Sequence, residues 1–250
     1  MKLTVVIPAR MSSSRFPGKP LADILGLPMI EHVRRRVLLH PDVEDAIVAT
    51  CDDEILNVVI SNGGKSVMTS PDHYCCNDRV AEASQGIDAD IIINVQGDEA
   101  LFNPEMLNYL IEPYQQDPSL KCINLMTKIR TDEEFYDINE VKVVCDLKNN
   151  ALYLSREPIP SGRKTKSKNF PRYKQLGIYA LQKELLSQFL KWGPSPWESI
   201  ETVDMLRLLE HGHLIRMAVS PFETISVDTP KDLELVKQLM KKDPLFEKYA

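Results

Sequence analysis

The chain has 250 residues, of which 43% are hydrophobic and 26% charged, and its formal net charge is −6. This composition is typical of a soluble globular protein; the negative charge argues against general nucleic-acid binding, and no apolar run is long enough to cross a membrane. The five cysteines are odd in number and lack C-x-x-C spacing, which argues against a disulfide framework or zinc site and favours the reducing cytoplasm. Because a strand is expected from residue 3, we expect no signal peptide.

Apolar, strand-like runs alternate with amphipathic helical patterns along most of the chain. The predicted strands lie at 3–7, 45–50, 65–68, 90–95 and 122–127, and the predicted helices at 28–39, 53–62, 78–86, 181–192, 199–211 and 230–242. This order predicts an α/β fold with a mostly parallel, doubly wound sheet, in one domain over residues 1–250.

The middle of the chain departs from this alternation. Residues 141–153 are typical of a hairpin with its turn near Asn149 and Asn150, and they predict a small antiparallel lobe at about 135–180. Residues 157–174 are rich in proline, lysine and arginine, which predicts a mobile loop.

The first predicted strand leads directly into a basic loop. The β-branched run of Val5, Val6 and Ile7 ends at Pro8, and the loop that follows carries Arg10, Arg15 and Lys19. Ligands of open α/β sheets bind beyond the carboxyl ends of the strands, so these cations and the free backbone N–H groups predict a polyphosphate site. The loop matches neither the Walker A nor the G-x-G-x-x-G pattern. The alternative is a solvated basic loop.

Two aspartates are candidate metal ligands. Asp98 closely follows the apolar run 91–93, and Gly97 beside it allows a ligand to approach the backbone; the alternative is a turn aspartate. Asp228 is also expected at a strand end. It opens the sequence Asp-Thr-Pro-Lys-Asp, which by itself favours a helix N-cap over a metal ligand.

Several blocks, in order along nearly the whole chain, carry a resemblance to a known family. They are Ile7–Leu21 (IPARMSSSRFPGKPL), Pro28–His32 (PMIEH), Val48–Thr50 (VAT), Asn94–Glu99 (NVQGDE), Tyr153–Pro160 (YLSREPIP), Gly177–Tyr179 (GIY) and Val227–Pro230 (VDTP). This pattern resembles the sugar-acid cytidylyltransferases, and most closely the 3-deoxy-manno-octulosonate (Kdo) cytidylyltransferase family.

The resemblance implies an enzyme in which a substrate hydroxyl attacks the α-phosphorus of CTP and pyrophosphate leaves. It implies Mg²⁺ held by Asp98 and Asp228, and catalytic roles for Arg15, Lys19 and Asp98. It implies nucleotide contacts by Pro8, Ala9, Arg10, Ser14, Arg15 and Lys19. It also implies a homodimer formed through the antiparallel lobe, with no nucleic-acid or membrane partner.

The resemblance further implies an acidic small-molecule acceptor, with its carboxylate on Arg79. The other acceptor-binding residues carried over are Gln96, Arg156, Gln175, Tyr179 and Asp204, and Lys142 is a further cation placed near that pocket. The alternative for Arg79 is a surface pair with Glu82, three residues further along a helix.

Departures from the family pattern concentrate among the acceptor positions. Cys76-Asn77 replaces Gly-Thr, Gln175 replaces His, Asp204 replaces Glu, and Ala100 replaces Pro; Met11 also stands where the basic loop of the family has Gly. They favour a related acid, such as an amino-substituted ulosonic acid or a small phosphonate, while Kdo with neutral drift stays equally open. A non-catalytic nucleotide-binding protein and a sugar-phosphate nucleotidylyltransferase are less favoured.

The remaining motifs receive no functional role from the sequence. Cys75 and Cys76 are interpreted as small buried residues, and His73, His211 and His213 as structural or solvated. The run Arg34–Arg36 is interpreted as a solvated helix face.

Overall fold

The computed structural model describes residues 2–13, 15–164 and 170–250. The chain divides into two compact units: residues 1–107 with 224–250 form unit 1, and residues 108–223 form unit 2. The predicted lobe at 135–180 lies within unit 2, and the single domain over 1–250 stays a prediction. Within the described ranges, none of the helices has the length and apolar character that a membrane span requires.

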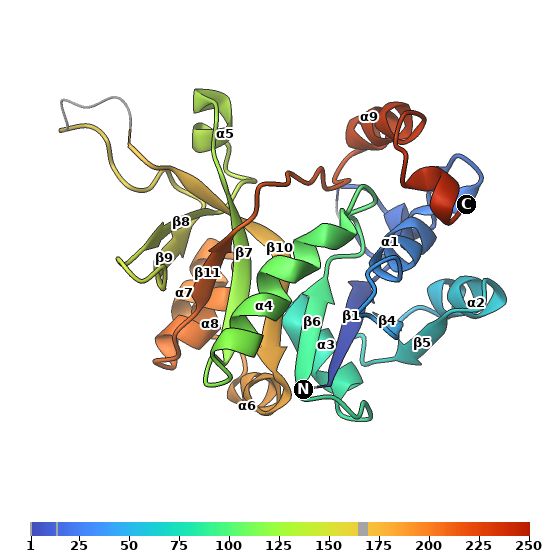
Figure 1. The fold of residues 1–250 in the computed structure, drawn as a ribbon, viewed down its shortest axis with the longest axis horizontal. Coiled ribbons are helices and arrows are strands. Elements are labelled where there is room, and N and C mark those ends of the chain that lie inside the picture. Colours follow the sequence, from blue (N-terminus) through green and yellow to red (C-terminus); the bar gives the residue numbers. More distant parts are fainter. Residues whose placement is uncertain (1, 14, 165–169) are drawn as a thin grey trace. The chain divides into compact units, whose positions relative to one another are not determined.

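Unit 1 is built on a parallel sheet in the order β6-β1-β4-β5 (Figure 1). The strands are β1 (Leu3–Ala9), β4 (Ala46–Thr50), β5 (Lys65–Met68) and β6 (Ile91–Val95). The side chains of β6 are buried along its whole length, and those of β1 are buried from residue 4 onward, as expected for central parallel strands covered on both faces. The predicted strands in this part of the chain are confirmed.

Helices connect and flank these strands. They are α1 (Met29–Val37), α2 (Asp53–Ser61), α3 (Cys76–Ser84) and α9 (Pro230–Met240), with 3-10 turns η1 (Lys19–Leu21), η2 (Pro104–Leu107) and η3 (Phe246–Lys248) and the short ribbon β2 (Asp23–Ile24)–β3 (Leu27–Pro28). Apolar residues of α9 pack with Ile24, Met29, Ala100 and Val227 in one buried cluster. The returning segment 224–250 is therefore part of the core of unit 1.

The arginine run on α1 does not face solvent, so that prediction is wrong. Arg34 is 6% exposed and Arg36 is 1% exposed. Arg34 forms a bidentate ion pair with the fully buried Glu31, with N–O distances of 2.9 and 2.6 Å. Arg36 binds the carboxylate of Asp243 and the carbonyl of Phe102. The C-terminal segment covers Arg36, whereas Arg34 also donates to the carbonyl of Asn62 after α2, at 3.2 Å, so each buried guanidinium has oxygen partners.

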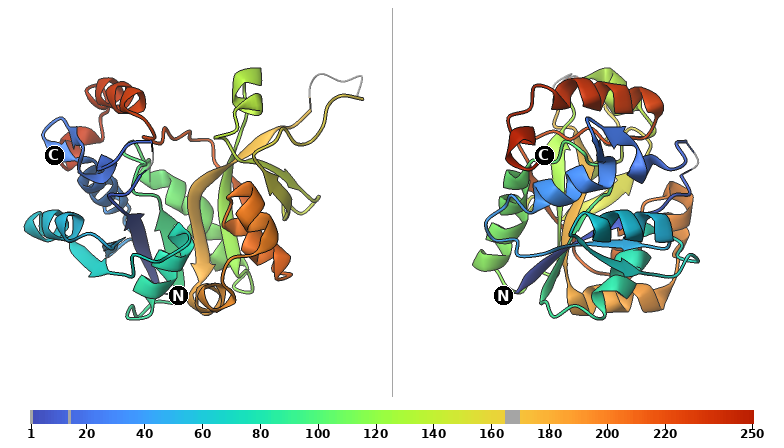
Figure 2. Two further views of the ribbon diagram at one scale, coloured as in Figure 1. Left: turned by 180° about the vertical axis from the view of Figure 1, so that it is seen from behind. Right: turned by 90° about the vertical axis from the view of Figure 1, so that its right-hand side faces the viewer.

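Unit 2 contains β7 (Cys122–Lys128), β8 (Lys142–Cys145), β9 (Ala151–Ser155), β10 (Tyr173–Gln182) and β11 (Arg216–Val219). Strand β10 pairs antiparallel with β7 and β8, β8 with β9, and β11 lies parallel to β7. Its helices are α4 (Asn108–Gln116), α5 (Asp132–Tyr136), α6 (Lys183–Trp192), α7 (Pro196–Glu201) and α8 (Met205–Glu210). Figure 2 shows the β8–β9 hairpin beside α7 and α8.

The hairpin prediction is confirmed, including its turn: Asn149 has φ 59°, a left-handed conformation that asparagine tolerates. The predicted helix at 199–211 is instead two helices, because Thr202, with φ 53°, interrupts it. The predicted helix at 181–192 begins two residues later, where β10 ends at Gln182. The predicted loop 157–174 ends within β10, and its residues 165–169 lie outside the described part of the chain. The α/β class with a mostly parallel sheet and an antiparallel lobe is confirmed.

Candidate active site

The basic loop begins where β1 ends, and local hydrogen bonds hold it in a compact turn. The N–H of Met11 donates to Oδ2 of Asp52 at 2.8 Å, while the carbonyl of Met11 accepts from the N–H groups of Ser13 and Gly18, both at 2.9 Å. Gly18 has φ 75°, which a residue without a side chain adopts easily. This turn places η1, and with it Lys19, over the carboxyl end of the sheet.

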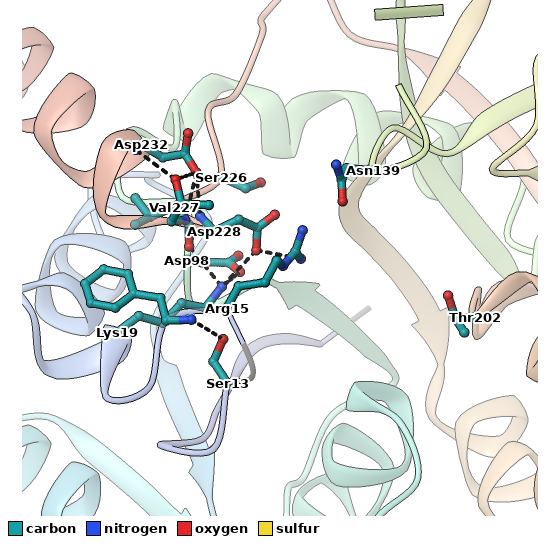
Figure 3. A network of polar contacts seen from close by, with 12 residues as sticks. Ser13, Arg15, Lys19, Asp98, Asn139, Thr202, Ser226, Val227, Asp228 and Asp232 are labelled. Carbon is teal, nitrogen blue, oxygen red and sulfur yellow. Dashed lines mark hydrogen bonds and ion pairs between the residues drawn. The ribbon is translucent and has the colours of Figure 1, made fainter. Parts of the chain in front are cut away.

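The ammonium group of Lys19 joins the two candidate metal ligands. Its Nζ lies 2.6 Å from Oδ2 of Asp98 and 3.2 Å from Oδ1 of Asp228, and it donates to the carbonyl of Val227 at 2.9 Å. Arg15 Nη2 lies 3.0 Å from the same Asp228 oxygen. Figure 3 shows these side chains converging. Burial acts to lower the pKa of Lys19, but Asp98 and then Asp228 outweigh it, so the pKa of Lys19 is raised above its usual value.

Asp228 reaches this position differently from the sequence expectation. Residues 224–229 have no regular secondary structure, so Asp228 does not follow a strand. The N-cap alternative is also wrong, because Thr229 caps α9: its side chain accepts from the N–H of Asp232, and the Asp232 carboxylate accepts from the N–H of Thr229. The carboxylate of Asp228 therefore caps no helix and instead forms ion pairs with Lys19 and Arg15.

Asp98 follows the end of β6, as predicted, and lies in a turn, which the alternative interpretation expected. Gly97 beside it accommodates the protein backbone. A Cβ on Gly97 would lie 2.7 Å from the carbonyl oxygen of Pro8. The absence of a side chain thus lets the end of β6 approach the end of β1. This close approach brings Asp98 next to the basic loop.

A cavity of about 300 Å³ opens in unit 1 around these groups. Nine of the predicted site residues line it: Pro8, Ala9, Arg10, Arg15, Lys19, Arg79, Gln96, Asp98 and Asp228. Ser13, Pro20, His73 and Cys75 also line it and were not predicted, and the sequence had already placed Gly97 beside a ligand and Cys76 among the acceptor positions. Ser14 lies outside the described residues.

One part of the cavity wall comes from α3 and the loop before it. Arg79 is 3% exposed and bonds to the hydroxyl of Thr69, so the surface-pair alternative is wrong. Cys76 accepts a hydrogen bond from the Gln96 amide at 3.1 Å. Cys75 and Cys76 are half-buried and line the cavity, which corrects their interpretation as buried packing residues.

Glu82 pairs with His73 in this wall rather than with Arg79. His73 Nε2 contacts Oε2 of Glu82, and the same oxygen accepts the N–H of Ser70 at 2.8 Å. Burial acts to raise the pKa of Glu82, but these hydrogen bonds and the charge of His73 lower it below its usual value. The pair fixes the loop that carries His73 to α3.

The other predicted acceptor residues belong to unit 2. Gln175 donates to Oδ1 of Asn124 at 2.7 Å, Tyr179 is 1% exposed, and Asp204 precedes α8. The guanidinium of Arg156 donates to the carbonyls of Glu201, Ile138 and Thr202 at 2.8, 3.0 and 3.2 Å. Their contact with an acceptor stays a prediction.

Lys142 is fully buried and connects two chain segments of unit 2. Its ammonium donates to the carbonyls of Asp137 at 2.8 Å, Glu140 at 2.7 Å and Arg156. Burial lowers the pKa of Lys142. In this structure its bonds join the loop after α5 to the end of β9.

The fold and the site define an α/β nucleotide-binding enzyme: a basic loop at the carboxyl end of a parallel strand faces two carboxylates in a cavity. The cytidylyltransferase family model matches residues 4–243, and the chain belongs to this family. The resemblance noted in the sequence is thereby confirmed.

Individual relatives agree with this assignment. The chain is 43% identical over 250 residues to the 3-deoxy-manno-octulosonate cytidylyltransferase of Geobacter sulfurreducens, covering 96% of this chain and 100% of that protein. It is 44% identical over 237 residues to the 8-amino-3,8-dideoxy-manno-octulosonate cytidylyltransferase of Shewanella frigidimarina, covering 93% and 96%. A solved structure of CMP:2-keto-3-deoxy-manno-octonic acid synthetase complexed with CTP matches with a TM-score of 0.90 and 39% identity, covering 97% of this chain and 99% of that one.

Proposed function

We propose that this enzyme transfers CMP from CTP to a hydroxyl of a 3-deoxy sugar acid, Kdo or its 8-amino derivative, and releases pyrophosphate. The observation that carries the proposal is the ammonium of Lys19 shared by Asp98 and Asp228, at 2.6 and 3.2 Å, beside the end of β1. The family match and the relatives named for these two acids support the same chemistry.

The two aspartates fit a divalent cation. Mg²⁺ is usually held by one or two carboxylates together with substrate phosphates and water, and both carboxylates here reach one cationic group. Among the residues that the structure describes, no three His, Cys, Asp or Glu side chains gather as a metal site. Phosphate oxygens and water would therefore fill the remaining coordination positions of the cation. When bound by Asp98 and Asp228, Mg²⁺ would neutralise phosphate charge and polarise the α-phosphoryl group.

The chain's own residues supply positioning and positive charge. The acceptor oxygen forms a bond to the α-phosphorus while the bond to the pyrophosphate oxygen breaks, and the hydroxyl proton passes to solvent. Arg15 and Lys19 lie where the triphosphate would meet the carboxylates, so they hold its oxygens and offset the charge that develops. Arg10, exposed at the end of β1, is placed to contact the nucleotide. Ser14 stays a predicted contact.

The acceptor is proposed to bind on the α3 wall of the cavity. The Arg79 guanidinium would receive its carboxylate, and the Gln96 amide, which now bonds Cys76, would bond an acceptor hydroxyl. A change from His to Gln at position 175 removes a titratable donor but keeps a neutral one, so we propose that the departures adjust the acceptor that is preferred.

Pyrophosphate release from CTP and Mg²⁺ tests this proposal, with Kdo, its 8-amino derivative and a small phosphonate as separate acceptors. We expect release with at least one of the two sugar acids. Release with Kdo alone would identify the departures as drift, and a preference for the 8-amino acid would identify them as specificity determinants. Release only with the phosphonate, or tight CTP binding without release for any acceptor, would contradict the proposed acceptor class.

We also propose a homodimer formed through the lobe, and activity in the cytoplasm. Leu152 on β9 is 63% exposed, and Ile200 on α7 and Leu214 before β11 are 71% and 68% exposed. Apolar side chains exposed to this extent are candidates for an interface where they form one patch. The five cysteines form no disulfide, in keeping with a reducing compartment. Light scattering should give twice the mass of the 28.4 kDa chain, and a monomeric mass would contradict the dimer.

A further inference from the structure

A buried hydrogen bond connects residues that neighbour the two proposed metal-binding carboxylates in the chain. Glu99 follows Asp98 in the chain and is 2% exposed. Its Oε1 accepts a hydrogen bond from the hydroxyl of Ser226 at 2.6 Å. Ser226 stands two residues before Asp228, so one bond connects the neighbours of both carboxylates.

The segment around Asp228 depends on such individual contacts because it belongs to no strand or helix. The N–H of Val227 donates to the carbonyl of Asp98 at 3.1 Å, and the carbonyl of Val227 accepts from Lys19 at 2.9 Å. Segments without a regular hydrogen-bond ladder take their position from bonds of this kind. In this set, the contact between Ser226 and Glu99 is the one in which both partners are side chains.

We propose that Glu99 is a positioning residue that holds the Asp228 segment, through Ser226, at the spacing from Asp98 that divalent-cation binding requires. The inference rests on the metal site of the proposed function. Groups that orient metal ligands commonly change metal affinity 10- to 100-fold when they are removed.

The contact is poorly suited to a role in stability alone. Oε2 of Glu99 is buried and has no hydrogen-bond partner among the described residues. A buried carboxylate with an unpaired oxygen is unfavourable compared with a neutral amide of the same shape. Loss of the contact should therefore change cation affinity more than thermal stability.

Mn²⁺ binding without nucleotide, followed by the electron paramagnetic resonance signal of free Mn²⁺, measures this directly. Ser226→Ala and Glu99→Ala should each raise the Kd for Mn²⁺ about tenfold. Glu99→Gln keeps an oxygen that accepts from Ser226, so its Kd should stay within about threefold of the unaltered enzyme. The double variant with both alanines should bind no more weakly than Glu99→Ala alone, because Glu99→Ala already removes the Ser226 contact, together with the interaction between Glu99 and Thr224.

Ser66→Ala is the matched control. The Ser66 hydroxyl is half-buried in β5 of the same unit and donates to the carbonyl of Val48 at 2.9 Å. This variant loses one hydrogen bond away from the carboxylates, so its Kd for Mn²⁺ should not change. Melting temperatures measured on the same samples confirm that each variant is folded.

The outcomes separate this inference from the proposal on which it rests. If the unaltered enzyme binds no Mn²⁺, with or without CTP, the metal site itself is contradicted. If it binds Mn²⁺ and Ser226→Ala binds equally well, the metal site stands and the positioning role of Glu99 is overturned. Equal weakening by Ser66→Ala and Ser226→Ala would also overturn it, because the effect would then be general destabilisation.

Discussion

Lys19→Met should tighten divalent-cation binding by the nucleotide-free enzyme while abolishing turnover. The Lys19 ammonium is bonded to both carboxylates that would hold the metal, and its side chain is only 13% exposed. A cation that binds there must displace this ammonium or bear its repulsion. Methionine keeps an unbranched side chain of similar length but removes the charge. Turnover should be lost because the triphosphate loses a cation that offsets its charge.

The size of the effect follows from the charges involved. With an effective dielectric constant between about 20 and 80, a unit charge and a divalent charge about 6 Å apart repel by roughly 1.4 to 5.5 kcal/mol. Because the flexible Lys19 side chain can swing aside, the lower end of this range applies. A difference of about 1.4 kcal/mol corresponds to a roughly tenfold lower Kd for the cation.

A Mn²⁺ titration without CTP, read by the resonance of free Mn²⁺, gives this Kd. Lys65→Met is the control, because Lys65 forms an exposed pair with Asp45, 2.6 Å long, in the same unit. It removes the same charge far from the carboxylates and should leave the Kd unchanged. An unchanged or higher Kd in Lys19→Met would refute the reasoning, since it would mean that the ammonium and the metal do not compete.

Three further predictions concern the surrounding structure. Gly97→Ala places a Cβ 2.7 Å from the Pro8 carbonyl oxygen, so urea unfolding should show a loss of about 1–3 kcal/mol, together with a fall in kcat/KM. Glu198→Ala leaves the fully buried Arg207 without the carboxylate that it now contacts twice at 2.7 Å, so unfolding should become about 3–5 kcal/mol easier. The pKa of Glu82 is lowered, so near pH 4.5 the folded protein binds fewer protons than the unfolded chain. The stabilisation that ionised Glu82 gives the folded state is therefore complete above pH 4.5 and is lost as the pH falls through the lowered pKa. Glu82→Gln should therefore flatten the stability–pH curve in acid, and a curve parallel to that of the unaltered protein would contradict this.

The sequence predicted the parts of unit 1 whose signals are local. A β-branched run at residues 5–7, a basic loop and an aspartate after a second apolar run were enough to place Arg15, Lys19 and Asp98. In unit 2 the strand β7 and the β8–β9 hairpin were predicted, but strand periodicity failed at β10, which reads YKQLGIYALQ and shows no clear alternation of apolar and polar residues. The break at Thr202 was also hidden, because a left-handed threonine is imposed by tertiary packing rather than by local preference.

Contacts made by residues distant in sequence could not be derived from local patterns. Three successive arginines on α1 suggested solvent, since nothing near them in the sequence shows that the turn after α2 covers Arg34 and that the C-terminal segment covers Arg36. His73 and Cys76 could have been found by a general rule rather than a motif. His73 lies in the connection between β5 and α3, and Cys76 is the first residue of α3, at the edge of the sheet where ligands of α/β proteins bind.

Val227 shows why the stability of unit 1 and the geometry of its site are linked. Its side chain is fully buried in the cluster that joins α9 to the β2–β3 ribbon. Its N–H and carbonyl meanwhile bond the backbone of Asp98 and the ammonium of Lys19, at 3.1 and 2.9 Å. The hydrophobic packing that docks the returning segment 224–250 therefore also sets the distance between Asp98 and Asp228. A substitution in that core, even one without contact to substrate, should move one carboxylate relative to the other, and the affinity for the divalent cation should be the first property to change.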